Sequence, residues 1–287
     1  MCPNWKPLLP LSVTAAIIFN ACQGTAIDSK ESSAKSDTTS VISEFQLQES
    51  ILTASESYRI TSSDEDSTVY YLSLSSSVQW PESLGKHKIQ ALRDTIISIA
   101  FGPTKYDDVR NAIKASVTDV SQFGLGDKIE RIESVPDSIA PNELYSNRTV
   151  QMVECTEQTV TYSAAWSEYL GGAHPNSGAT PFTFVLASDS IVNMNYLFKP
   201  GAEKELLPKI LESLAMNYSM SVEELNNALL NSPASVTGNV YILNNTIVFH
   251  YNPYDILPYS YGASDAYIIP YEVADLLTPQ AKKLLLD

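Results

Sequence analysis

His174 and the loop around Tyr254 are the parts of this 287-residue chain whose residue types are best suited to chemistry. His174 lies in a turn with Asn176, and a tyrosine-rich loop far along the chain carries Tyr254, Asp255 and Tyr259. An imidazole close to a carboxylate can act as a general base, and tyrosine is enriched in recognition surfaces. In a functional interpretation these five side chains line one cleft and are candidates to contact a ligand or partner, and we assign no catalytic residue.

A purely structural interpretation of the same residues stays open. Gly171 and Gly172 precede His174, and glycine readily adopts the positive φ angles that other residues avoid. In this interpretation His174 hydrogen-bonds the backbone of its own turn. The tyrosines of the second loop, which ends at Gly262, then pack that loop onto a sheet.

Other sequence signatures of catalysis are missing or isolated. The chain has three histidines, with no HExxH motif and no histidine pair at metal-ligand spacing, so we expect no metal and no cofactor. The segment Ser83-Leu-Gly-Lys86 fits the SxxK pattern of penicillin-binding enzymes but lacks the SDN and KTG partner motifs. Cys155 lies in an expected strand, where a small buried apolar role is typical.

The N-terminus has the form of a lipoprotein signal. Lys6 precedes an apolar stretch from Leu8 to Phe19, which Asn20-Ala21-Cys22 follows. This stretch is shorter than the ~20 apolar residues that a membrane-spanning helix needs. It resembles the lipobox of bacterial lipoproteins, in which cleavage precedes a cysteine that is then acylated, for example with palmitate. We predict a signal peptide over residues 1–22 and a lipid on Cys22. An ordinary cleaved signal is the alternative.

Composition limits the expected location of the protein and the classes of partner that it can bind. Residues 23–44 are rich in Ser and Thr and predict a flexible tether, which would hold a folded body at a membrane facing the periplasm or the cell exterior. The formal net charge is −15 at pH 7. This charge argues against nucleic-acid binding and favours a cationic partner. Solubility alone would also explain it.

Hydrophobic periodicity predicts an α+β fold with antiparallel sheets built from hairpins and helices inserted between the strands. We expect two related or packed subdomains, an N-terminal domain over residues 45–147 and a C-terminal domain over residues 148–287. Expected strands are residues 45–60, 69–75, 149–156, 159–168, 182–187, 191–197, 239–243, 246–251 and 267–271. Expected helices are residues 89–100, 106–120, 202–216, 221–230 and the segment after 278, with a short helix near 128–132.

Two groups of motifs together resemble a known domain. They are Gly171-Gly-Ala-His174 with Phe182-Thr-Phe-Val185 and Asn195-Tyr-Leu-Phe198, and the loop from Phe249 to Gly262 with Ile268-Ile-Pro-Tyr271. These motifs resemble the C-terminal domain, of unknown function, that is shared by lysozyme-sensing anti-sigma factors of the RsiV type and peptidoglycan deacetylases of the PdaC type. Trp80-Pro81 and the helix after it resemble the companion N-terminal domain more weakly. The resemblance covers roughly residues 46–277.

The resemblance implies a binding or sensing module, because in the RsiV type this domain binds lysozyme outside the cell. Nothing in the sequence resembles the metal-binding signature of the deacetylases or the cytoplasmic segment of the anti-sigma factors, so we do not expect those activities. We predict an envelope lipoprotein that binds a lysozyme-like cationic protein or peptidoglycan. The alternatives are an envelope hydrolase that uses His174 with Asp255 or Glu168, and a purely structural surface protein.

Overall fold

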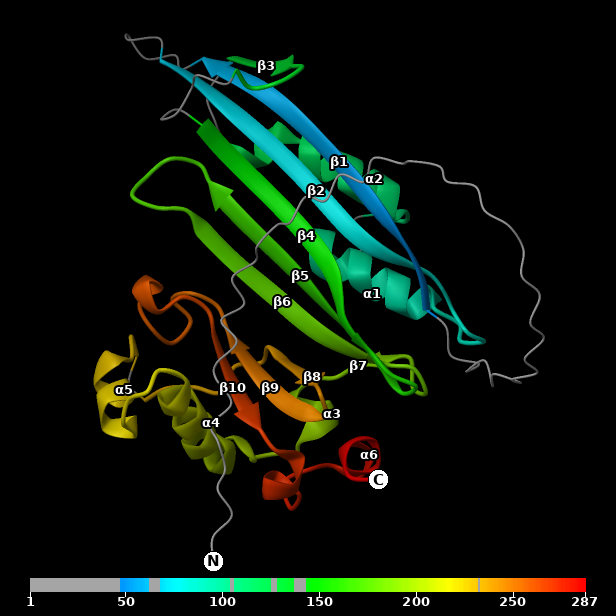
Figure 1. Ribbon diagram of the computed structural model, residues 1–287, viewed down its shortest axis with the longest axis vertical. Coiled ribbons are helices and arrows are strands. Elements are labelled where there is room, and N and C mark those ends of the chain that lie inside the picture. Colours follow the sequence, from blue (N-terminus) through cyan, green and yellow to red (C-terminus); the bar gives the residue numbers. More distant parts are fainter. Residues whose placement is uncertain (1–46, 62–67, 104–105, 125–127, 137–142, 232) are drawn as a thin grey trace, which may run out of the picture. The chain divides into compact units, whose positions relative to one another are not determined.

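The computed structural model describes residues 47–287 except 62–67, 104–105, 125–127, 137–142 and 232. The predicted signal peptide, Cys22 and the tether lie outside the described residues. The described residues belong to a single compact unit (Figure 1). Its described part contains a mixed sheet of seven strands, an antiparallel sheet of three strands and six α-helices. The prediction of an α+β fold is confirmed.

The seven-stranded sheet has the strand order β3-β1-β2-β4-β5-β6-β7. Its strands are β1 (Leu47–Thr61), β2 (Val69–Leu84), β3 (Lys128–Ile132), β4 (Glu143–Cys155), β5 (Thr159–Tyr169), β6 (Asn176–Val185) and β7 (Ser190–Ile191). The three-stranded sheet contains β8 (Val240–Leu243), β9 (Thr246–Tyr251) and β10 (Ser264–Ile268), with β9 in the middle. The α-helices are α1 (Gln90–Phe101), α2 (Val109–Thr118), α3 (Met194–Leu197), α4 (Glu203–Asn217), α5 (Val222–Ala228) and α6 (Pro279–Leu285). Among the described residues, none of the helices has the length and apolar character needed to cross a membrane.

One pairing of the main sheet departs from the expected hairpins. β2 and β4 run parallel, from Tyr71 opposite Glu143 to Val78 opposite Val150. Parallel neighbours need a crossover connection. Here α1 and α2 lie in that connection and cover one face of the sheet (Figure 1). The expected domain boundary between residues 147 and 148 falls inside β4, and the division into two domains stays a prediction.

Three local predictions are wrong. The segment expected as a short helix near residues 128–132 forms β3, which pairs with β1 at the sheet edge. The strand expected over residues 191–197 ends at Ile191, and Asn193 then caps α3 by accepting a hydrogen bond from the Tyr196 N–H. The final strand lies at Ser264–Ile268 rather than at 267–271, because Pro270 begins a 3-10 turn.

The helix-covered face of the main sheet carries most of its apolar core. In one row across four strands, Leu52 is paired with Val78, Val78 with Val150 and Val150 with Ala164, and all four side chains are buried. This row belongs to a cluster completed by α1. A smaller cluster around Leu72 lies further along the strands, and a third fills the space between α4 and the three-stranded sheet. The fold therefore has separate apolar clusters rather than one continuous core.

A pair of buried threonines joins the two sheets. Thr161 and Thr183 are opposite each other in β5 and β6, both are fully buried, and their hydroxyl oxygens are 2.8 Å apart. The Ile242 N–H donates to Thr183 Oγ1 at 2.8 Å, and Thr161 Oγ1 donates to the Ile242 carbonyl at 2.9 Å. If the Thr183 hydroxyl donates to Thr161, the three hydrogen bonds form a closed ring. In this ring Thr161, Thr183 and Ile242 each donate one hydrogen bond and accept one. β8 is thereby fixed against β5 and β6.

Candidate functional site

The turn that carries His174 connects β5 to β6. Gly171 and Gly172 have φ angles of 94° and 114°, a region that side-chain-bearing residues rarely adopt. The Tyr169 hydroxyl, at the end of β5, donates to the Gly172 carbonyl at 3.0 Å. The turn leaves the His174 side chain exposed to solvent.

The tyrosine-rich loop after β9 is held by a short local turn. The Asn252 N–H donates to Asp255 Oδ2 at 2.8 Å, and the Asp255 N–H donates back to the Asn252 carbonyl at 3.0 Å. Between them, Tyr254 has a φ angle of 71° and its side chain is 51% exposed. A bulky residue with positive φ is uncommon and costs of order 1–3 kcal/mol, and such strain concentrates at functional positions. The loop ends at Gly262, whose φ is 72°.

The structure brings the two loops together at their aromatic side chains. The His174 ring stacks on Tyr259 with centroids 3.9 Å apart and an interplanar angle of 20°. His174 Nε2 lies 3.2 Å from the Tyr254 hydroxyl, and the two tyrosine rings are 5.6 Å apart. We call His174, Tyr254 and Tyr259 the aromatic cluster. It joins residues 80 positions apart in the chain.

Both ring nitrogens of His174 have hydrogen-bond partners, and neither partner is a carboxylate. Nδ1 lies 2.7 Å from the Pro175 carbonyl, which only accepts, so Nδ1 carries the hydrogen and Nε2 accepts from the Tyr254 hydroxyl. Asp255, an expected partner, accepts from the Asn252 backbone instead. Asn176 Oδ1 accepts from the adjacent Ser177 N–H. The hydrogen bonds of the described residues thus pair His174 with no carboxylate.

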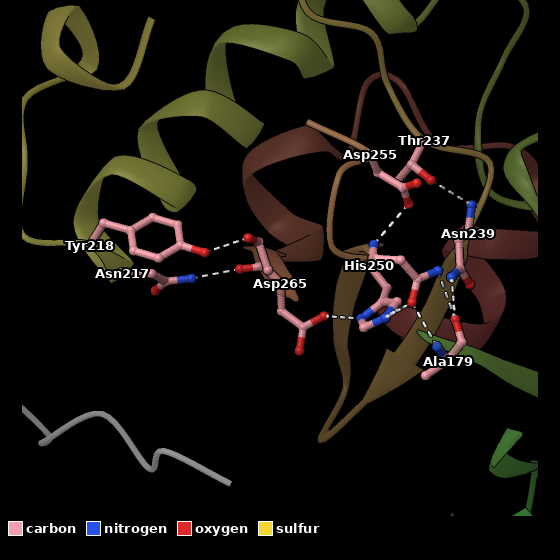
Figure 2. A network of polar contacts seen from close by, with 10 residues as sticks. Ala179, Asn217, Tyr218, Thr237, Asn239, His250, Asp255 and Asp265 are labelled. Atoms are coloured by element: carbon pink, nitrogen blue, oxygen red, sulfur yellow. Dashed lines mark hydrogen bonds and ion pairs between the residues drawn. The ribbon is translucent and has the colours of Figure 1, made fainter. Parts of the chain in front are cut away.

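A second polar network surrounds His250, four residues before Tyr254 in the sequence (Figure 2). His250 is 8% exposed, and its Nδ1 lies 2.7 Å from Asp265 Oδ1 on the neighbouring strand β10. Its Nε2 lies 3.2 Å from Asn252 Oδ1. The edge of β10 is covered by α4, where Asn217 donates to the Asp265 carbonyl and Ser213 accepts from the Tyr267 N–H.

Asn252 ties this network to the main sheet. Its Oδ1 accepts from the Ala179 N–H at 2.6 Å, and its Nδ2 donates to the Ala179 carbonyl at 3.1 Å. This two-way pairing with β6 fixes which end of the amide is the acceptor. His250 therefore faces an acceptor oxygen at both ring nitrogens. Asn239 Nδ2 donates to the same carbonyl at 3.2 Å.

Part of the chain matches a known protein family. Residues 195–272 match the family model described as protein of unknown function (DUF3298). The chain carries a DUF3298 domain. The match includes Asn252, Tyr254, Tyr259 and the His250–Asp265 pair, whereas His174 precedes it. The aromatic cluster is thus formed between the DUF3298 segment and a turn outside it. No match was found among curated proteins.

Two crystal structures of DUF3298 proteins have similar folds. A member of the family from Bacteroides fragilis is 18% identical, with a TM-score of 0.64, and the match covers 85% of this chain and 98% of that one. A DUF3298 protein from Pseudomonas aeruginosa is 14% identical, with a TM-score of 0.54, and the match covers 82% of this chain and 96% of that one. Similarity at this level shows a shared fold that extends well beyond residues 195–272.

The sequence did not predict the His250 network of the DUF3298 domain. The final strand was expected at 267–271, and that placement left Asp265 in a loop, away from His250. With β10 at Ser264–Ile268, His250 and Asp265 become direct cross-strand partners. The sequence did contain a signal for this network. His250 lies within the largely apolar strand Thr246–Tyr251, and Asn252 follows it directly. A polar group at a buried strand position needs a hydrogen-bond partner.

The environment of Cys155 does not favour a reactive thiol. Burial, together with the charges of Glu49 and Glu154, raises the pKa of the Cys155 thiol to about 11, and the thiolate is the reactive form of cysteine. No group of three or more His, Cys, Asp or Glu side chains that could hold a metal ion occurs among the described residues.

Gly178 is the point where the main sheet leaves room for Asn252. A Cβ at this position would lie 3.0 Å from Trp166 Nε1 and 3.1 Å from Asn252 Oδ1. We expect Gly178→Ala to lower the free energy of unfolding by about 1–3 kcal/mol, the usual cost of an added methyl in a packed site. Gly238→Ala is the matched control, because nothing lies within 4 Å of its added Cβ. Urea unfolding of both variants measures the difference, and equal stabilities would contradict the close contact.

Proposed function

We propose that this protein is an extracytoplasmic lipoprotein whose folded part binds a partner at the cell envelope through the aromatic cluster. The observation that carries the proposal is a set of stacked rings from two distant loops, in which His174 and Tyr254 are exposed, Tyr259 is half-buried and Tyr254 has a positive φ angle. Aromatic side chains of this kind supply large contact areas and are common in the energetic centres of interfaces. Strain at Tyr254 is also easier to understand if its orientation serves recognition.

Charge supports a cationic protein as the partner, with a lysozyme-like protein as the specific expectation. The net charge of −15 attracts a cationic partner and speeds its association. The resemblance of the motifs to lysozyme-sensing proteins points to the same class. Purified peptidoglycan is the second ligand to test, because an envelope protein meets it and because aromatic rings also stack on sugars.

The experiment measures binding of the full chain to purified lysozyme and to peptidoglycan. We expect Tyr259→Ala to weaken binding by about tenfold or more, since loss of a central aromatic contact typically costs over 1 kcal/mol. Tyr271→Ala is the matched control, because Tyr271 is 68% exposed and lies outside the cluster. An equal loss in both variants would overturn the assignment of the cluster. A wild-type chain that binds neither ligand above a charge-matched acidic protein would overturn the proposed partners.

The lipid anchor is tested separately. We expect the wild-type protein to fractionate with membranes and Cys22→Ala to move to the soluble fraction, because acylation requires the thiol. Mass spectrometry of the mature N-terminus gives an independent measurement. A Cys22→Ala protein that remains in the membrane fraction would refute the anchor while leaving the binding test intact.

A further inference from the structure

A polar row interrupts the helix-covered face of the main sheet. Next to the buried Val78 and Val150 row, Ser76 is paired with Arg148 and Arg148 with Trp166. One step further, Ser146 is paired with Glu168. These residues separate the apolar cluster that includes Val150 from the one that includes Leu72. Because the face is covered by helices, the polar side chains meet a partly enclosed space rather than open solvent.

Arg148 is a half-buried cation in this row. Its Nη1 donates to the Ala100 carbonyl near the end of α1, and the guanidinium lies 5.5 Å from the centre of the Phe101 ring. Burial lowers the pKa of Arg148, but an arginine still keeps its charge at neutral pH. The described residues include no ion pair that involves Arg148. A guanidinium has five N–H donors, so most of them stay available after the bond to Ala100.

Arg148 and Glu168 line the same polar pocket, of about 250 Å³. Ser116, Gln122 and Ser146 supply hydroxyl and amide groups to its wall. Ser75 also lines the pocket. The next residue, Ser76, is the register neighbour of Arg148 and is not part of the pocket lining; it is 2% exposed, and its hydroxyl has no hydrogen-bond partner among the described residues. The pocket thus combines one cation, one anion and several neutral polar groups in a partly desolvated place.

We propose that this pocket binds a small zwitterion of the α-amino-acid class. Arg148 pairs with the carboxylate through its planar fork, which suits a carboxylate better than an ammonium group does. Glu168 accepts from the ammonium group, and the serines and Gln122 contact the remaining polar atoms. A simple anion is disfavoured by Glu168 and by the net charge of −15, and a simple cation by Arg148. The pocket is smaller than the ~300–1,000 Å³ usual for drug-sized ligands, which restricts the ligand to a few heavy atoms.

Calorimetric titration of the full chain with glycine and with D- and L-alanine tests the proposal. Acetate and methylammonium are the matched probes, because each carries one half of the zwitterion. We expect saturable binding of at least one amino acid, and binding of each single-charge probe weaker by about tenfold or more. Absence of amino-acid binding at millimolar concentration, or acetate binding as tight as that of the amino acids, would overturn the proposal.

Two conservative variants assign the binding to the pocket. Arg148→Lys keeps the charge but loses the fork, and Glu168→Gln keeps the shape but loses the charge. Each is expected to weaken amino-acid binding by about ten- to a hundredfold, the value of a hydrogen bond to a charged group. Arg131→Lys is the control, since Arg131 lines a separate pocket near Glu56. Circular dichroism verifies folding. If both pocket variants bind as the wild type does, the site is elsewhere and the proposal fails.

Discussion

Thr183→Val is expected to lower the free energy of unfolding by about 3 kcal/mol, although valine has nearly the same shape as threonine. The substitution removes the acceptor of the buried Ile242 N–H and the donor to Thr161. A buried donor without a partner costs its full desolvation penalty. For a folded part of this size, a loss of about 3 kcal/mol corresponds to a fall in Tm of roughly 6–12 °C, measured by calorimetry.

The ring of hydrogen bonds also predicts an order among three variants. Thr161→Val costs less than Thr183→Val, because the Thr183 hydroxyl can turn to the Ile242 carbonyl, 3.3 Å away, and the Ile242 N–H keeps its acceptor. Thr180→Val, at an exposed position of the same strand β6, is expected to change stability by no more than about 0.5 kcal/mol. A Thr161→Val variant less stable than Thr183→Val would contradict the donor directions assigned to the ring.

Asn252→Ala is expected to lower the free energy of unfolding by about 3 kcal/mol, because the amide side chain of Asn252 bonds two partners, Ala179 and His250. The change removes both hydrogen bonds to the Ala179 backbone and the contact with His250 Nε2. Since His250 is buried and already paired with Asp265 on its other side, its second nitrogen loses its protein partner. Urea unfolding followed by tryptophan fluorescence measures the loss.

Asn176→Ala is the control for Asn252→Ala. Asn176 is exposed, and among the described residues its side chain accepts only from the neighbouring Ser177 N–H, so its removal is expected to change the free energy of unfolding by no more than about 0.5 kcal/mol. Similar stabilities for the two alanine variants would show that the Asn252 amide is not the link between β6 and the small sheet. A second readout is the binding assay, because the Asn252 side chain fixes the start of the loop that carries Tyr254 to Ala179 of β6.

The sequence predicted most strands and helices from local patterns. It also named the residues of the aromatic cluster as candidates, but not the His250 network. Alternation located most of β1 and the first part of β2, and the capping box at Ser221 located the start of α5. It did not show that β2 continues through Trp80 and Pro81 to Leu84. The sequence offered His174, Tyr254 and Tyr259 as candidate contact residues and left open whether their loops meet, and the structure brings these three side chains together.

Features that depend on pairing between distant segments could not be predicted from the sequence. The parallel pairing of β2 with β4 could not be predicted, because polar–apolar alternation within one strand does not show which strand lies next to it. A three-residue shift in the position of β10 was enough to conceal the His250–Asp265 pair. The polar row through Arg148 likewise exists only across strands, because within β4 the residue lies in an ordinary mix of polar and apolar positions.

The parallel alignment of β2 and β4 has a consequence for how fast the chain folds. Tyr71 must find Glu143, and α1 and α2 must already lie on the correct side when the strands join. Closing a loop of this length costs entropy before any contact compensates for it, so folds rich in distant pairings form slowly. During that interval β2 has hydrogen-bonding groups along one edge that await β4. We therefore expect the joining of these strands to limit the folding rate, and a chain cut before β4 to expose an edge prone to association.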